Sequence, residues 1–399
     1  MISRGIQLVG LEDAGVAVLD CEHRTPALKP DGYVYVAIPD LVEGRIDTSR
    51  ARRISPEDYE SWTRRTTPES GDVVVTRRGR VGDSAVVPEG LKCAIGQNLV
   101  ILRSDGTRLD QRYLRWAVRS PQWWSEVDRL INVGAVFSSL NVRDIARVRV
   151  PAHELAEQRA IADVLSALDD KIAANTRLAR VADELASQLF TRAVRGIEPG
   201  DQTFGEAAEV RGGGTPSSTI QDYWDGDIRW ATPTDVTGLT GPYLVETARN
   251  ITAAGLANCS SALHPAGSIL MTSRATIGAF ALARVPTAVN QGFIVVVPNG
   301  SAPGLWLFHE MRSRIEEFTS LANGATFLEL SRGNFKSFHV RLAEPAVMAQ
   351  FQEHATALHD RAAAALRENQ RLAATRDALL PALMSGHLRV RDAEIRLSL

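Results

Sequence analysis

Two loops of this sequence place arginine and threonine side chains at the same spacing. Their sequences are GDVVVTRRGRVG at 71–82 and GSILMTSRATIG at 267–278. Four positions are shared, with the two members of each pair 196 positions apart: Gly71 and Gly267, Thr76 and Thr272, Arg78 and Arg274, and Gly82 and Gly278. Guanidinium and hydroxyl groups can bind phosphates or donate to base edges, but these loops hold no nucleophile beside a general base. The loops therefore favour recognition over catalysis.

Motifs of the common catalytic and metal sites are missing. There is no GxxxxGK[ST] phosphate-binding loop, the eight histidines are scattered, and no Asp/Asn-Pro-Pro-aromatic sequence occurs. Asp169, Asp170 and Lys171 resemble a nuclease D/ExK only by chance, because they lie in a helical heptad pattern. The three cysteines are far apart and predict neither a disulfide nor a thiolate metal site. We expect no catalytic residue, metal or cofactor in this chain.

Length and composition are those of a soluble protein with two or more domains. The chain has 399 residues, of which 44% are hydrophobic and 23% charged, and no apolar run long enough to span a membrane. We therefore expect a cytoplasmic protein. A net charge of −2 argues against nucleic-acid binding by overall charge, although arginines cluster at 50–53 and 77–80. A solvated face of mixed charge is the alternative explanation of those clusters.

The similarity of the two loops extends into a duplicated domain. HRTP, ending at Pro26, corresponds to GGTP, ending at Pro216, and AIGQNLVIL with Gln97 corresponds to AVNQGFIVV with Gln291. The period is far too long for a solenoid repeat. Each copy has short β-branched runs that predict strands, at 33–38 and 72–76 in the first and at 268–272 and 293–298 in the second.

Each copy ends in a long helical pattern, starting at Glu157 and at Met348. Apolar residues recur every seven positions, in one series with Asn175 and in the other with Asn369. The two stripes predict an intramolecular, antiparallel coiled coil, in which the asparagines either fix the register or meet solvent at the edge. About 37 helical residues would span roughly 55 Å, more than one turn of duplex DNA.

The duplicated unit resembles the specificity subunit of type I restriction-modification systems. The segment EQRAIADVLSALDDKIAANTRL, from Glu157 to Leu178, is similar to the first spacer helix of that family almost position by position. EVRGGGTPSSTIQDYWDGDIRWATPTDV, from Glu209, resembles the start of a recognition domain, and DCEHRTP from Asp20 is similarly typical. The resemblance covers nearly the whole chain.

This resemblance implies a mixed α/β (α+β) fold with two target-recognition domains, at 1–152 and 197–343. They would be separated by spacer helices at 153–196 and 344–399 that form the antiparallel coiled coil. It also implies that each domain reads one half of a bipartite, asymmetric site in double-stranded DNA. Two modification subunits would dock on the helices and methylate adenine with S-adenosylmethionine, and two restriction subunits would use ATP and Mg. No membrane partner is implied.

The candidate DNA-binding residues follow from the donors that base edges and phosphates require. They are Thr76, Arg77, Arg78, Arg80, Gly82, Gln97 and Asn98 in the first copy, and Thr272, Ser273, Arg274, Gly278, Asn290 and Gln291 in the second. We expect the shared Arg78 and Arg274 to bind phosphate or hold the loop. Specificity is expected where the copies differ, at Arg77 against Ser273 and Arg80 against Thr276. A structural hairpin, with amides that satisfy buried backbone groups, is the alternative.

Two other functions compete with DNA recognition. One is a protein adaptor whose coiled coil binds partners without touching DNA. The other is a fused nuclease or methyltransferase, which the missing motifs disfavour.

Overall fold

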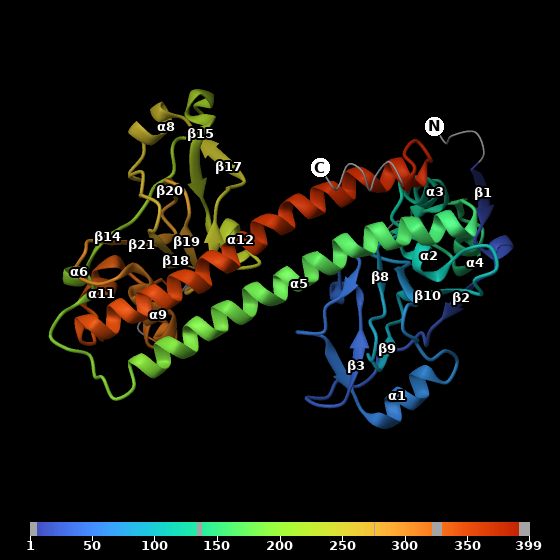
Figure 1. Cartoon of the computed structure of the whole chain (residues 1–399), viewed down its shortest axis with the longest axis horizontal. Helices are drawn as coiled ribbons and strands as arrows, with labels where there is room; N and C mark the ends of the chain where they lie inside the picture. The colour runs from blue at the N-terminus through green and yellow to red at the C-terminus, as the bar shows by residue number, and fades with distance from the viewer. Residues whose placement is uncertain (1–5, 134–137, 275, 321–328, 391–399) are drawn as a thin grey trace. The chain divides into compact units, whose positions relative to one another are not determined.

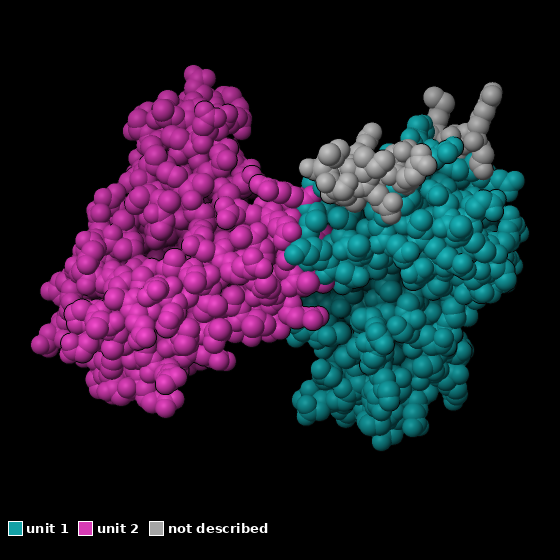
Figure 2. Space-filling model, viewed as in Figure 1, with its two compact units in different colours: residues 1–171, 372–399 teal, residues 172–371 magenta. Residues whose placement is uncertain are grey.

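The computed structural model describes residues 6–133, 138–274, 276–320 and 329–390 (Figure 1). The chain separates into two compact units, residues 1–171 with 372–399 and residues 172–371, coloured separately in Figure 2. Each unit contains one copy of the duplicated domain together with part of each long helix. The helices are therefore shared by the units instead of forming a separate body.

The first unit is built on a sheet with the strand order β2-β10-β7-β8-β5-β4. A second sheet has the order β6-β3-β9, and β1 with β13 and β11 with β12 form two-stranded pairs. The strands are β1 Gln7–Gly10, β2 Val16–Asp20, β3 Tyr33–Val36, β4 Leu41–Val42, β5 Arg45–Ile46, β6 Arg52–Ile54, β7 Val73–Thr76, β8 Ser84–Val86, β9 Cys93–Ile95, β10 Leu99–Ser104, β11 Asn132–Val133, β12 Ser138–Ser139 and β13 Arg149–Ala152. The helices are α1 Pro56–Thr63, α2 Gln111–Ala117, α3 Pro121–Leu130 and α4 Val142–Ala146, with 3₁₀ turns at Glu12–Ala14 and Ile38–Asp40.

The second unit repeats this topology. Its main sheet has the order β14-β21-β18-β19-β16, and its second sheet has the order β17-β15-β20. The strands are β14 Ala208–Arg211, β15 Trp224–Ala231, β16 Tyr243–Leu244, β17 Arg249–Ile251, β18 Ile269–Thr272, β19 Phe280–Ala283, β20 Thr287–Val289 and β21 Phe293–Pro298. The helices are α6 Phe204–Ala207, α7 Pro233–Thr237, α8 Ala253–Ala257, α9 Gly304–Ser313, α10 Ile315–Ser320 and α11 Arg332–Ser337, with a 3₁₀ turn at Gln221–Tyr223.

Strand directions match between the units as well as strand order. The central strands β7 and β18 pair antiparallel with both neighbours, and the pairs β5·β8 and β16·β19 are parallel. In the second sheets, β3·β9 and β15·β20 are parallel, whereas β3·β6 and β15·β17 are antiparallel. The duplication and the predicted strands at β3, β7, β18 and β21 are confirmed.

The long helices α5 Leu155–Ala193 and α12 Pro345–Met384 pack antiparallel. Asp169 pairs with Arg376, Asn175 with Glu368, and Phe190 packs on Phe351, so partners on α12 run backwards as α5 runs forwards. The heptad residues Ile161, Leu168, Ala182, Ala355, Ala362 and Leu383 are all buried. The predicted mixed fold with an antiparallel helix pair is confirmed.

The core of each unit joins its sheet to the helices. In the first unit, Val75 and Leu102 of the sheet share a cluster with Leu165 of α5 and Leu383 of α12. In the second, Met271 and Phe308 share one with Ala182 and Ala362. Small alanines at these helix positions allow close approach of the sheet layer, because an interior is packed to the density of an organic crystal.

Candidate nucleic-acid interface

The loops after β7 and β18 have the same internal closure. Thr76 is fully buried and its Oγ1 donates to the carbonyl of Arg80, while the Gly82 amide donates to the Thr76 carbonyl at 2.9 Å. Thr272 is also fully buried and donates to the carbonyl of Thr276, and the Gly278 amide reaches the Thr272 carbonyl at 3.0 Å. In both units, this threonine and this glycine shape the loop.

Both loop glycines adopt a left-handed conformation beneath a helix. Their φ angles are 91° at Gly82 and 88° at Gly278. A Cβ on Gly82 would lie 2.9 Å from Trp124 of α3, and one on Gly278 would lie 2.0 Å from Ile315 of α10. Glycine is required here both for the backbone angle and for the close packing.

The shared arginines differ in their partners. An isolated β-bridge joins the backbones of Arg78 and Ser139, and another joins those of Arg274 and Glu329. Next to each bridge a leucine amide donates to a loop carbonyl: Leu140 to Arg77 at 2.9 Å, and Leu330 to Ser273 at 3.0 Å. Arg274 forms an ion pair with Glu329, with Nη2 and Oε1 2.8 Å apart. The exposed Arg78 has no side-chain hydrogen bond or ion pair within the described ranges.

The arginines found only in the first loop reach other segments of their unit. Arg80 donates to the carbonyls of Ile38 and Leu41 at 2.6 and 2.8 Å and pairs with Asp83 at 3.2 Å. Arg77 Nη2 lies 3.3 Å from His23 Nδ1, and His23 Nε2 lies 2.9 Å from Asp20 Oδ2.

In the second copy the corresponding loop positions have shorter side chains. Ser273 is buried, and its amide donates to Gly292 at 2.8 Å. Thr276, which corresponds to Arg80, is exposed.

The predicted amides lie beside the loops in both units. Gln97 Nε2 contacts Thr25 Oγ1 at 3.4 Å, and Thr215 Oγ1 donates to Gln291 Oε1 at 2.7 Å, so each glutamine contacts the threonine of the Thr-Pro segment. The Asn98 carbonyl accepts from the Arg77 amide, and Asn290 Oδ1 accepts from the Gly292 amide at 2.8 Å. The structure therefore gathers loop, glutamine and Thr-Pro segment at one surface of each unit.

A polar cavity of about 350 Å³ lies at this surface of the second unit. Its lining includes Gly212, Gly213, Arg274, Gln291, Glu329 and Arg332. By alignment of the Thr-Pro segments, Gly213 stands where the first copy has His23. The cavity at the corresponding glutamine of the first unit is smaller, about 140 Å³.

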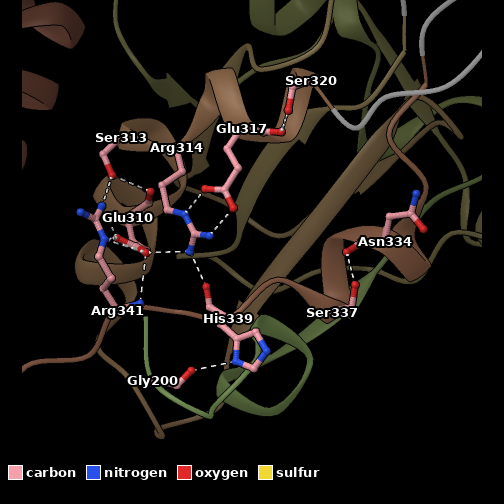
Figure 3. Close-up of polar contacts among 10 residues, drawn as sticks. All are labelled: Gly200, Glu310, Ser313, Arg314, Glu317, Ser320, Asn334, Ser337, His339 and Arg341. Carbon is pink, nitrogen blue, oxygen red and sulfur yellow. Dashed lines mark hydrogen bonds and ion pairs between the residues drawn. The ribbon is translucent and has the colours of Figure 1, made fainter. Parts of the chain in front are cut away.

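Each unit also contains a buried glutamate that pairs with two arginines, which the sequence alone did not predict. Glu310 of α9 is fully buried and lies 2.8 Å from Arg341 Nη2 and 3.1 Å from Arg314 Nη1, as Figure 3 shows. Glu126 of α3 lies 2.9 Å from Arg129 and 3.0 Å from Arg149. Burial alone would raise the pKa of Glu126, but hydrogen bonds from the two arginines keep it below its ordinary value. An arginine three or four residues after the glutamate is the only local signal.

The asparagines predicted to set the helix register do not pair with each other. Asn175 is buried and donates to Glu368 Oε2 at 2.7 Å. Asn369 donates to the carbonyl of Ile172 at 3.1 Å and to Thr176 Oγ1 at 3.0 Å. All three bonds cross from one helix to the other, and a role in register stays a prediction.

The residues that the structure describes hold neither a candidate membrane span nor a candidate metal cluster. No helix there is long and apolar enough to cross a membrane. The same ranges hold no group of three or more His, Cys, Asp or Glu side chains that could bind a metal ion.

Comparison with known proteins identifies similar sequences and a similar overall fold. Residues 201–364 match the family model of the type I restriction modification DNA specificity domain. The MjaIX specificity subunit of Methanocaldococcus jannaschii is 36% identical over 142 residues, which cover 35% of this chain and 33% of that protein. The HindI specificity subunit of Haemophilus influenzae is 24% identical over 190 residues, covering 47% and 41%, and the EcoR124I/EcoR124II specificity subunit of Escherichia coli is 29% identical over 155 residues, covering 37% of each.

The matched segments thus span between a third and about two fifths of the length of these relatives. The similarity of fold extends further. The crystal structure of the type I restriction-modification S subunit from M. genitalium has a TM-score of 0.59 at 16% identity, covering 96% of this chain and 98% of that chain. At that identity the comparison establishes the fold alone.

Proposed function

We propose that this chain is a specificity subunit of a type I restriction-modification system, because residues 201–364 match the family model of that DNA specificity domain. In this proposal it reads DNA for such a complex and catalyses no step itself. Each copy of the duplicated domain reads one half of a bipartite, asymmetric site. The observation that carries this proposal is the doubled surface. The Thr76 and Thr272 loops have the same backbone closure but present different side chains.

This arrangement suits the recognition of two unlike half-sites. A common scaffold holds each loop, glutamine and Thr-Pro segment in the same relation, while the exposed side chains around them differ. Base recognition depends on donors and acceptors at the groove edge, so changes in those side chains change the sequence that is read. Thr76 and Thr272 are buried and shape their loops, which leaves Arg78, Arg274 and Gln291 as exposed groups for DNA.

The long helices supply a surface for partner subunits. Val181 and Leu185 of α5 are 49% and 43% exposed, and half-buried Leu178 lies on the same helical face. An apolar stripe on a helix that already packs on its other side needs a further partner to leave water. In this proposal two modification subunits dock there and bring S-adenosylmethionine, and two restriction subunits add ATP and Mg. The complex acts in the cytoplasm, and the continuous helices set the gap between the half-sites.

The test is to assemble the chain with its modification subunits and map the methylated adenines on random DNA. The proposal predicts one bipartite, asymmetric motif and salt-sensitive binding. Methylation without a sequence motif, or a complex that forms but binds DNA no more tightly than the modification subunits alone, would favour the adaptor function instead.

A further inference from the structure

The ion pair between Arg274 and Glu329 stands at the candidate surface of the second unit. Arg274 follows β18, and Glu329 belongs to the segment that leads to α11. The two side chains meet at 2.8 Å while 47% and 43% exposed, so both functional groups face solvent at the rim of the 350 Å³ cavity.

The fold does not require this pair. The first unit closes the same backbone bridge between Arg78 and Ser139, with the same amide-to-carbonyl bond one residue further along. A serine therefore suffices at the position of Glu329. An exposed ion pair contributes little to stability, and here its components are positioned where the two copies differ.

The pair is also poorly suited to binding phosphate. A carboxylate 2.8 Å from a guanidinium cancels much of its positive charge and repels the phosphate oxygens. What remains is a set of donors directly beside a set of acceptors. Such a neutral, two-part surface complements a base pair better than a DNA backbone.

The two parts match the major-groove edge of a G·C pair. Guanine presents two acceptors, N7 and O6, and cytosine presents the N4 amino donor. O6 and N4 are themselves hydrogen-bonded, about 2.9 Å apart, which is close to the separation of the two side chains. In an A·T pair the adenine N6 donor separates the two acceptors, adenine N7 and thymine O4, so no adjacent pair of acceptors is available to the guanidinium.

We propose that Arg274 and Glu329 together read one G·C base pair in the half-site of the second unit. Arg274 donates to guanine, and Glu329 accepts from the cytosine amino group. This inference rests on the proposed function. It also assigns Arg274 to a base pair, where the sequence alone suggested a phosphate contact.

The experiment uses the full complex with the modification subunits and a randomised duplex pool. Glu329→Gln removes the charge at nearly constant shape, and Glu329→Ser installs the residue that the first unit has at this position. Both should relax discrimination at a single G·C position of one half-site, on the order of 10- to 100-fold, and leave the other half unchanged. Arg78→Ala is the matched control in the other unit and should affect only the other half-site.

Salt dependence separates base from phosphate contact. Arg274→Ala should weaken binding without changing the slope of log affinity against log salt, whereas loss of a phosphate contact lowers the slope by about one. Thermal unfolding of each variant checks that the chain remains folded. Failure of the wild-type complex to yield a bipartite motif would refute the proposed function itself.

Other outcomes would refute the base-pair assignment alone. One is that both Glu329 variants keep the wild-type motif at every position. Another is that they relax discrimination at an A·T position instead of a G·C position. A third is that they relax discrimination in the same half-site that Arg78→Ala alters.

Discussion

Arg341 binds Glu310 in the second unit as Arg149 binds Glu126 in the first. In each case the arginine also donates its backbone amide to the same carboxylate, at 3.1 Å in the second unit and 3.4 Å in the first. The glutamate lies on α9 in the second unit and on α3 in the first, and the arginine lies just before α12 or α5. In each unit a buried glutamate therefore ties its helix to the segment that leads into a long helix.

Removing the charge of Glu310 should destabilise the second unit strongly. Glu310→Gln leaves Arg314 and Arg341 without their buried counter-ion, which typically costs about 3–5 kcal/mol. Urea unfolding followed by circular dichroism measures the loss. Glu317→Gln is the control, because Glu317 also pairs with Arg314 but is 45% exposed, and it should cost less than about 1 kcal/mol. Equal losses in the two variants would contradict the assigned role of Glu310.

Acid should destabilise the second unit through two buried histidines. His309 and His359 contact each other at 2.9 Å between their Nε2 atoms, and Tyr243 OH lies 2.8 Å from His359 Nδ1. Burial lowers the pKa of His309 to about 3 and that of His359 to about 4, with Arg312 nearby adding to both effects and Asp183 opposing them.

The unfolded chain therefore binds more protons than the native one from pH 6.5 down to these values. Stability is fully present above about pH 6.5 and falls as the pH drops, by roughly 1.4 kcal/mol per pH unit for each histidine. Urea midpoints between pH 7.5 and 4.5 test this. His359→Gln should flatten the dependence, whereas replacement of the exposed His354 of the same helix should not. An unchanged slope in His359→Gln would rule the pair out as the cause.

The loop glycines should control one half-site each. Gly278→Ala forces a side chain into the left-handed region and against Ile315, at a cost of at least about 1–2 kcal/mol, so binding to the second unit's half-site should fall. Gly267 has a similar φ of 88°, but a Cβ placed there would have no atom within 4 Å. Gly267→Ala is therefore the control that isolates the cost of the backbone angle. DNA binding with each half-site separately scrambled measures the effect, and equal behaviour of the two variants would show that packing on α10 is unimportant.

Charge on the exposed stripe of α5 should prevent assembly. Val181→Glu with Leu185→Glu should change the urea midpoint of the isolated chain little, because both side chains are already nearly half exposed, while binding of the modification subunits is lost. Val181→Leu with Leu185→Met keeps the stripe apolar and should retain the subunits in size-exclusion chromatography. Full assembly of the glutamate variant would place the docking surface elsewhere.

The sequence predicted the duplication, the strands and the helix pair because each depends on local periodicity or on direct comparison of the copies. Long side chains were harder to place. Arg80 appeared free to read DNA, but its guanidinium binds the carbonyls of Ile38 and Leu41, about 40 residues earlier in the chain. Glu310 and Glu126 looked like ordinary surface charges of a helix, because their burial depends on a distant arginine that no local pattern reveals.

The sharing of the long helices between the units also determines the order in which the chain can fold. Leu379, Leu380 and Leu383 of α12 belong to the core of the first unit, although the whole second unit precedes them in the sequence. During synthesis, the first recognition domain emerges from the ribosome long before the helix that completes its core. The second unit has all of its residues available earlier, so the domain made first is the one whose folding is completed last.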